Sequence, residues 1–271
     1  MLEVLHNGRI IEVPRPDSPG VASATLLETL AAEPHLTLFA PCGGRGKCGK
    51  CRVRIADPAG GPAPSEADRR FLSSKEIADG IRLACTCPAA KVKRVEILTE
   101  QTRATVKSEL PAFTGAATPP PFVTRAGLLA AAIDIGTTTV AAFLLDAAAG
   151  TPLAVHSRMN RQSVYGADVL SRISYAEDGG LRRLSLVIRA QLQAMLEELC
   201  AEAGRKPEEI GTVSVAGNTT MLHLLAAEDP AGLGRAPFVP GFTERREYAG
   251  GELDVELAPE ARVVLLPSVS D

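Results

Sequence analysis

The stretch Phe39-Ala40-Pro41-Cys42-Gly43-Gly44-Arg45-Gly46-Lys47-Cys48-Gly49-Lys50-Cys51-Arg52 decides the fold expected for the first part of this chain. Its three cysteines form a C-x5-C-x2-C array with four glycines among them, and Cys85 follows after 33 intervening residues. Glycine adopts positive φ angles without a steric penalty, so a glycine-rich loop can wrap closely around a bound group and point its N–H groups inward. The stretch therefore predicts a loop that ligates a metal centre through thiolates.

A 2Fe–2S cluster takes four cysteine thiolates, and three in a compact loop plus one distant cysteine resembles the plant-type arrangement. We therefore expect Cys42, Cys48, Cys51 and Cys85 to hold such a cluster. The side chains that would offset part of its negative charge are Arg45, Lys47 and Lys50.

Other roles for the cysteines are weaker. A structural zinc site usually pairs two short C-x2–4-C knuckles, whereas only Cys48 and Cys51 have that spacing here. A disulfide would suit a secreted protein, and the sequence shows no signal-peptide pattern. Inert thiols would leave the glycines unexplained. Cys87 is an alternative fourth ligand, and Cys200 is expected to be a core thiol on the apolar face of a helix.

The cysteine loop resembles the ferredoxin family, and its five-residue first spacing is closer to the adrenodoxin-like branch than to the plant one. The Leu83-Ala84-Cys85 context matches that family and favours Cys85 over Cys87. The resemblance implies an α+β fold of the β-grasp type. Periodicity and turn signals predict strands at residues 2–5, 10–13, 51–55 and 92–98, and helices at residues 25–32 and 65–71.

The composition limits the classes of protein to which this chain can belong. The 271 residues can form two domains, and the net charge of −3 provides no strongly basic surface for nucleic acid. We expect no membrane span, because the longest apolar candidate, residues 127–145, is interrupted by Asp134. A short basic run at Lys91, Lys93 and Arg94 is expected to be a solvated face or a docking patch for a partner. Six cysteines without a targeting segment favour a cytoplasmic location.

A proline-rich segment separates two parts of the chain. It includes Pro119-Pro120-Pro121, and consecutive prolines favour an extended, semi-rigid spacer. We expect a first domain over residues 1–98, a linker over 99–127 and a second domain over 128–271. The second domain is expected to comprise a middle part over about 128–205 and the start of a C-terminal part over 206–271.

The second landmark is an apolar strand that carries Asp134, turns through Gly136-Thr137-Thr138-Thr139 and returns as another apolar strand. An aspartate inside an apolar strand is costly unless it is paired, and hydrated Mg²⁺ is held through one or two carboxylates. The N–H groups and hydroxyls of the turn can contact phosphate oxygens, although the lysine of a Walker loop is absent. The turn resembles the first phosphate-binding loop of the acetate and sugar kinase, heat-shock cognate and actin (ASKHA) superfamily. The alternative is a plain hairpin whose threonines cap their own turn.

Further elements follow this turn. The sequence predicts a strand at residues 153–158, a helix at 169–176, a long amphipathic helix from Leu181 to Leu199 that ends near Gly204, and a strand at 212–216. The ASKHA resemblance implies that the end of this last strand faces the γ-phosphate. Gly217 and Asn218 therefore join the nucleotide-site candidates Asp134, Gly136, Thr137 and Thr138. Simple capping of the next helix by Asn218 or Thr219 is the alternative.

The four histidines are expected to be surface or core side chains without a ligand role, since none has ligand spacing around it. They are His6, His35, His156 and His223.

The order of features resembles the family of reductive activators of corrinoid-dependent enzymes. It runs from the ferredoxin loop through the proline linker and the D-x-G-T-T-T turn to N-R-Q-S-V-Y-G-A-D at residues 160–168 and V-A-G-N-T-T-M at 215–221. The resemblance implies one-electron transfer from a 2Fe–2S cluster to the Co(II) centre of a corrinoid iron–sulfur protein or corrinoid methyltransferase. A low-potential donor would act upstream, and ATP with Mg²⁺ would bind an α/β ASKHA-like domain. No catalytic acid or base is implied.

Members of that family continue beyond the position where this sequence stops, at Asp271. We therefore expect an incomplete ASKHA-like domain, an electron carrier, and no independent ATPase activity. A plain ferredoxin-type carrier with a non-catalytic docking module is the alternative function. A sugar or acyl kinase would explain the turn but not the cysteines.

Overall fold

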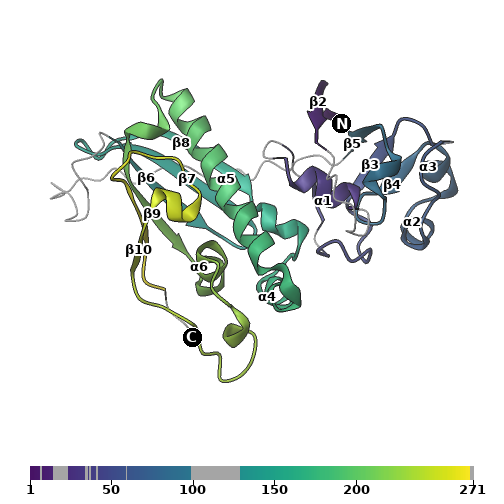
Figure 1. The fold of residues 1–271 in the computed structure, drawn as a ribbon. Helices are drawn as coiled ribbons and strands as arrows, with labels where there is room; N and C mark the ends of the chain where they lie inside the picture. Colours follow the sequence, from purple (N-terminus) through teal and green to yellow (C-terminus); the bar gives the residue numbers. More distant parts are fainter. Residues whose placement is uncertain are drawn as a thin grey trace. The chain divides into compact units, whose positions relative to one another are not determined.

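The computed structural model describes residues 1–6, 8–14, 24–33, 36, 38–40, 42–58, 60–98 and 129–268 (Figure 1). The chain divides into two compact units. The first comprises Met1–Thr102 with Arg161–Ala167, and the second comprises Arg103–Asn160 with Asp168–Asp271. The linker expected at residues 99–127 lies outside the described residues.

The first unit contains a five-stranded sheet with the order β2-β1-β5-β3-β4. The strands are β1 (Leu2–His6), β2 (Arg9–Val13), β3 (Arg52–Ile55), β4 (Ile81–Leu83) and β5 (Arg94–Ile97). The helices are α1 (Leu26–Ala31), α2 (Glu66–Phe71), α3 (Ser74–Ala78) and a short 3-10 helix (Ala89–Lys91). Figure 1 shows α2 and α3 at the β4 edge, where both contact β4.

Local sequence signals explain most of these elements. Gly8, at the β1–β2 turn, has a φ of +76°, a conformation that glycine adopts readily. The helices α1 and α2 begin at Thr25 and Ser65, whose side chains accept hydrogen bonds from the N–H groups three residues on. The predicted strands and helices of this unit are confirmed to within two residues at each end, whereas α3 and β4 were not predicted.

The second unit contains a six-stranded mixed sheet with the order β10-β11-β9-β6-β7-β8. Its strands are β6 (Leu129–Ile135), β7 (Thr139–Asp146), β8 (Pro152–Met159), β9 (Ile210–Gly217), β10 (Arg246–Ala249) and β11 (Arg262–Leu265). Strands β6, β7 and β8 are antiparallel neighbours, whereas β9 runs parallel to β6 and β11 runs parallel to β9. Strand β10 closes the sheet antiparallel to β11.

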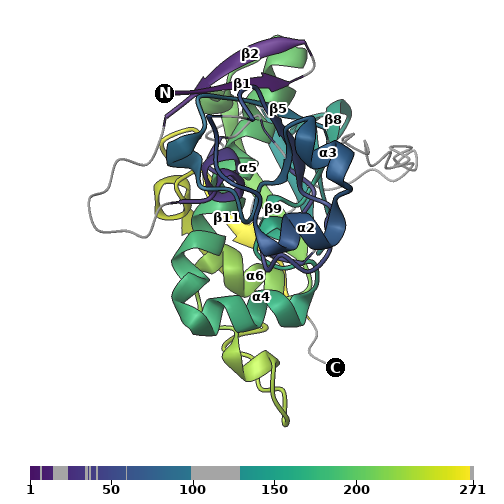
Figure 2. The same cartoon turned by 90° about the vertical axis from the view of Figure 1, so that its right-hand side faces the viewer.

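Helices cover this sheet. They are α4 (Val169–Tyr175), α5 (Leu181–Glu202) and α6 (Thr219–Ala226), together with a π-helical turn (Ala176–Gly180) and short 3-10 helices at Arg161–Val164, Pro207–Glu209, Ala231–Leu233 and Gly250–Leu253. Helix α5 runs across β7 and β8 (Figure 1), and α4 lies against α6 (Figure 2). None of the described helices is long and apolar enough to cross a membrane.

The elements predicted for this unit are also confirmed, including the hairpin through Gly136 and the long helix. Gly204 has a φ of +65° directly after the end of α5, as expected for a C-terminal cap. Cys200 is fully buried, in agreement with a core role. The strands that follow residue 206 hydrogen-bond into the same sheet as β6–β8, so this unit is built around one continuous sheet.

Candidate functional site

The four cysteines predicted to be ligands come together in the first unit. Cys42 and Cys48 lie in the loop before β3, Cys51 directly precedes β3, and Cys85 lies in the turn after β4. Their thiols form two hydrogen-bonded pairs, Cys42 with Cys48 and Cys51 with Cys85. The first pair is partly exposed and the second is buried. Two pairs of thiolates match the ligand set of two irons with two protein ligands each.

The loop backbone also fits a cluster. All four of its glycines adopt positive φ angles, between +63° and +77°. At Gly49 a side chain would also meet a steric block, because its Cβ would lie 2.8 Å from Cβ of Phe71. The backbone N–H groups that donate to the cysteine sulfurs include those of Arg45, Gly46, Lys47, Cys48, Lys50 and Ala84. This is the inward-pointing N–H arrangement that the glycine spacing predicted.

The two thiols of the buried pair differ in pKa. The hydrogen bond from the Cys85 thiol lowers the pKa of Cys51 to about 7. The same bond, together with burial, raises the pKa of Cys85. Cys51 is thus close to the thiolate form that binds metals.

Two alternatives can be compared with this geometry. In the part of the chain that the structure describes, no group of three or more His, Cys, Asp or Glu side chains is placed to hold a single metal ion. A structural zinc site usually pairs two short C-x2–4-C knuckles, a spacing that only Cys48 and Cys51 have here. Cys87 is also buried, and burial raises its pKa to about 12, with Asp68 and Arg82 as its charged neighbours.

Asp68, in the first turn of α2, is a positioning residue. It is 1% exposed, and its Oδ1 accepts a hydrogen bond from the N–H of Leu83 at 2.7 Å. Its Oδ2 accepts from the N–H and hydroxyl of Ser65 at 2.8 and 2.9 Å. A second link joins the hydroxyls of Ser65 and Thr86 at 2.9 Å. The start of α2 is therefore tied to the turn that carries Cys85.

The nucleotide-site candidates lie together where the inner strands β6 and β9 of the second sheet end. In the parallel pairing of β6 and β9, Asp134 lies opposite Ala216 and Ile135 lies opposite Gly217. The turn at residues 136–138 and the end of β9 therefore leave the sheet side by side. Gly136 has no room for a side chain, since a Cβ there would lie 2.7 Å from the carbonyl oxygen of Thr139.

Asn218 makes two different bonds at this edge. Its Oδ1 accepts from the N–H of Met221 at 2.9 Å, which is the capping role given above as the alternative. Its Nδ2 donates to Oγ1 of Thr137 at 3.1 Å. Capping and contact with the turn therefore coexist in one side chain.

One premise about Asp134 is wrong. A carboxylate inside an apolar strand, as the sequence predicts for this residue, would need a paired ion. The structure shows that its side chain is exposed, while the neighbouring Ile133 and Ile135 point to the buried face of β6. Because strand side chains alternate between faces, the carboxylate stays in water and needs no partner for stability.

Two buried polar residues hold the turn from within the unit, and sequence reasoning did not single them out as site residues. Asn160 donates from Nδ2 to the carbonyl of Gly136 at 2.8 Å, and from its backbone N–H to that of Thr138 at 2.7 Å. Arg172 donates from its guanidinium to the carbonyl of Thr137 at 2.6 Å. Both side chains are fully buried, and burial lowers the pKa of Arg172 to about 10, so it remains cationic near neutral pH.

The histidines that the structure describes occupy other surroundings. His223 is fully buried, donates from Nδ1 to the carbonyl of Thr219 at 2.7 Å and stacks on Phe242 with ring centroids 4.4 Å apart. Its Nε2 accepts from the N–H of Gly241 at 3.0 Å. His156 lies between the carboxylates of Glu198 and Glu202. His35 lies outside the described residues.

Comparison with protein families identifies both units. Residues 17–90 match the family model of the 2Fe-2S iron-sulfur cluster binding domain. Residues 129–271, more than half of the chain, match the model of the RACo middle region. The chain belongs to the RACo family.

Individual relatives agree with this assignment. The chain is 33% identical over 138 residues to the corrinoid activation enzyme RamQ of Eubacterium limosum, a match that covers 50% of this chain and 23% of RamQ. It is 34% identical over 84 residues to a polypeptide of the Na⁺-translocating NADH-quinone reductase of Psychrobacter cryohalolentis, covering 31% of this chain and 20% of that polypeptide.

A solved structure shares the fold over the full chain. It is that of a reductive activator for corrinoid, iron-sulfur protein, which superposes with a TM-score of 0.52 at 23% identity and covers 100% of this chain and 55% of the other. The chain thus spans 55% or less of the length of each of these three relatives.

Proposed function

We propose that this RACo-family chain passes one electron to a Co(II) corrinoid protein in a reaction linked to ATP. When bound by Cys42, Cys48, Cys51 and Cys85, a 2Fe–2S cluster would supply that electron. The proposal rests on two neighbouring thiol pairs, formed by three cysteines of the glycine-lined loop and Cys85 of the turn after β4, in a chain that also has a RACo middle region. The acceptor would be a corrinoid iron–sulfur protein or a corrinoid methyltransferase, and a low-potential donor would act before it.

We further propose that the second unit is the first part of an ASKHA-type domain that binds the phosphates of ATP. The strand order β8-β7-β6-β9-β11, with a tight turn between β6 and β7, supports this fold. The hydroxyls of Thr137 and Thr138, the backbone of Gly136 and Gly217, and the amide of Asn218 would contact phosphate oxygens. The exposed carboxylate of Asp134 is accessible to a hydrated Mg²⁺, which usually keeps several waters.

The buried residues beneath the turn would set its shape. Asn160 and Arg172 hold three successive carbonyls of the turn, those of Gly136, Thr137 and Thr138. A turn held before the ligand arrives loses less conformational entropy on binding. The domain limits 1–98, 99–127 and 128–271, and a cytoplasmic location where thiols stay reduced, belong to the same proposal.

The test is reduction of a Co(II) corrinoid protein under anaerobic conditions. The chain is reconstituted with iron and sulfide, supplied with titanium(III) citrate as donor, and the Co(II) paramagnetic signal is followed with and without MgATP. We expect loss of the signal only with the reconstituted chain, and faster loss with MgATP than with MgADP. Equal rates with and without nucleotide would favour a plain ferredoxin-type carrier. A chain that retains no iron would contradict both functions.

A further inference from the structure

A hollow of about 240 Å³ opens beside one of the proposed cluster ligands in the first unit. It is lined by Cys48, Gly49, Lys50, Arg52, Phe71 and Leu98. Cys48 belongs to the partly exposed thiol pair, whereas Cys51 and Cys85 are buried. This hollow therefore gives a partner molecule access to the proposed cluster from the side of its more exposed ligands.

The loop that lines one side of the hollow is positive, although the whole chain carries a net charge of −3. Residues 42–52 include four cationic side chains and no Asp or Glu. Arg52 already pairs with Glu76 at 2.5 Å, whereas Lys50 is exposed. On α2, the exposed Arg70 places its guanidinium carbon 5.3 Å from the ring centroid of Phe71. Two exposed cations thus flank an aromatic ring and a thiol.

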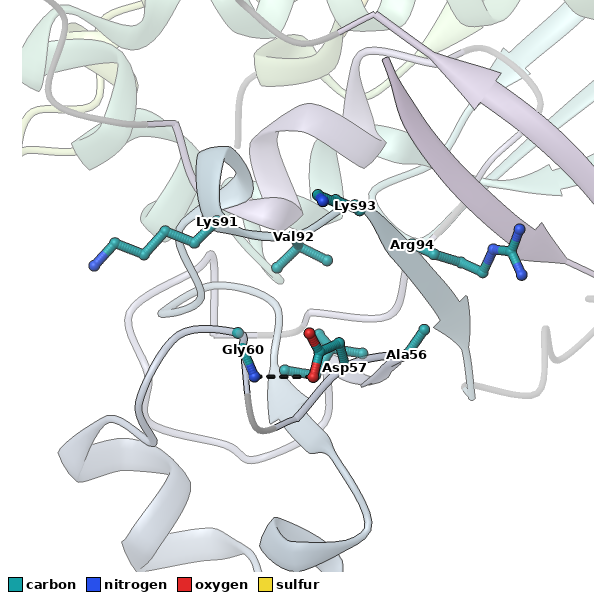
Figure 3. A pocket seen from close by; sticks show the side chains of 9 residues that line it. Ala56, Asp57, Gly60, Lys91, Val92, Lys93 and Arg94 are labelled. Carbon is teal, nitrogen blue, oxygen red and sulfur yellow. Dashed lines mark hydrogen bonds between the residues drawn. The ribbon is translucent and has the colours of Figure 1, made fainter.

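A second hollow of the same unit, of about 160 Å³, lacks these features (Figure 3). Its lining includes Lys91, Lys93 and Arg94 but no cysteine. Figure 3 shows Lys91 and Arg94 pointing in opposite directions, and Arg94 pairs with Glu3. An acidic side chain, Asp57, also lines this hollow. Its cations do not converge, and it serves as a matched control surface.

We propose that the hollow beside Cys48, flanked by Lys50 and Arg70, is the docking site for an acidic surface segment of a redox partner protein. The inference rests on the proposed function, since it takes Cys48 to be a cluster ligand. Charge complementarity steers encounter between proteins and fixes their register, while an aromatic and an arginine are typical of the residues that contribute most at interfaces. Such docking weakens as salt screens the charges.

The test measures binding of a fluorescein-labelled, glutamate-rich peptide to the full chain by fluorescence anisotropy. The double variant K50E/R70E is compared with K91E/K93E, which makes the same change in net charge on the control surface. We expect about tenfold weaker binding for K50E/R70E and less than about twofold for K91E/K93E, with binding to the parent chain lost at high salt. The neutral variant K50Q/R70Q covers the case in which charge reversal disrupts the fold. Its affinity for the peptide should lie between those of the parent and K50E/R70E.

Two results would overturn the docking site. One is equal weakening by the two charge-reversed pairs, because only net charge would then matter. The other is a parent chain that binds no acidic peptide at low salt. Peptide binding needs neither iron nor nucleotide, so a chain that binds the peptide at this surface but reduces no corrinoid protein contradicts the proposed function and leaves the docking site in place.

Discussion

The side-chain amide of Asn218 donates to Oγ1 of Thr137 at 3.1 Å, across 81 positions of the chain. This bond joins the end of β9 to the turn between β6 and β7. The same side chain caps α6 by accepting from the N–H of Met221 at 2.9 Å. One residue therefore connects a helix start to the proposed phosphate loop, and its two roles can be separated by substitution.

Asn218→Asp should separate them. Aspartate keeps the capping acceptor and is as good a cap as asparagine, so the free energy of unfolding should change by less than about 0.5 kcal/mol. It loses the donor to Thr137 and adds a negative charge, so binding of MgATP measured by calorimetry should weaken about tenfold. Asn218→Ala should lose both roles and also cost about 1 kcal/mol of stability. Unchanged nucleotide binding in Asn218→Asp would remove this residue from the site.

Arg172→Ala should destabilise the second unit. It removes the fully buried guanidinium that donates to the part-buried carbonyl of Thr137, which costs about 1–3 kcal/mol before any cavity is counted. Urea unfolding followed by circular dichroism measures the change. The matched control is Arg158→Ala, which removes an exposed pair with Glu198 and should cost less than about 1 kcal/mol. Equal losses in the two variants would contradict the role given to Arg172.

Most elements can be predicted from the sequence because their limits carry strong local signals. Gly8 and Gly136 mark tight turns, and Thr25 and Ser65 mark helix starts through capping. Short elements with weak signals were missed. Helix α3 has five residues and no buried face, and β4 has three residues, so neither shows a measurable period.

The contacts and exposure of the site residues are harder to predict from the sequence, for a physical reason. Whether Asp134 faces solvent depends on which face of β6 the helices cover, and a strand rich in alanine does not reveal that. The contacts of Asn160 and Arg172 with the turn join elements 24 and 35 positions apart, and no periodicity encodes them. A polar side chain on the apolar face of a predicted helix, as at Arg172, is the signal that could have drawn attention to it.

Asp68→Ala should loosen the turn that carries Cys85. The N–H of Leu83 would lose its acceptor while it stays buried, at a cost of about 1–3 kcal/mol. In the reconstituted chain, iron should be lost to a chelator several times faster than from the parent. Asp79→Ala, an exposed substitution beyond α3, is the control and should leave that rate unchanged. Iron loss at the parental rate in Asp68→Ala would show that this carboxylate does not position the ligand.

His223 should make the second unit sensitive to acid. Burial lowers its pKa below 6.5 in the folded chain, against about 6.5 when unfolded. Below pH ~6.5 the unfolded chain binds a proton that the folded chain does not, until the folded pKa is reached. The free energy of unfolding should therefore fall in this window by up to about 1.4 kcal/mol per pH unit, and be unaffected by His223 at higher pH.

The measurement is the difference between the unfolding curves of the parent and His223→Gln over that pH range. His6, whose pKa burial also lowers, is present in both proteins and cancels in the difference. A parent and a variant with parallel pH profiles would show that His223 titrates alike in the folded and unfolded chain.

The paired substitutions Cys85→Ser and Cys87→Ser test the central claim most directly, since these cysteines are two positions apart and both are buried. Each protein is reconstituted anaerobically with iron and sulfide, reduced, and compared with the parent by iron content and electron paramagnetic resonance. The two thiol pairs predict that Cys87→Ser keeps the parental iron content and the signal of a reduced 2Fe–2S centre, whereas Cys85→Ser loses or strongly alters both. A Cys85→Ser protein with the parental spectrum and iron content would contradict the account.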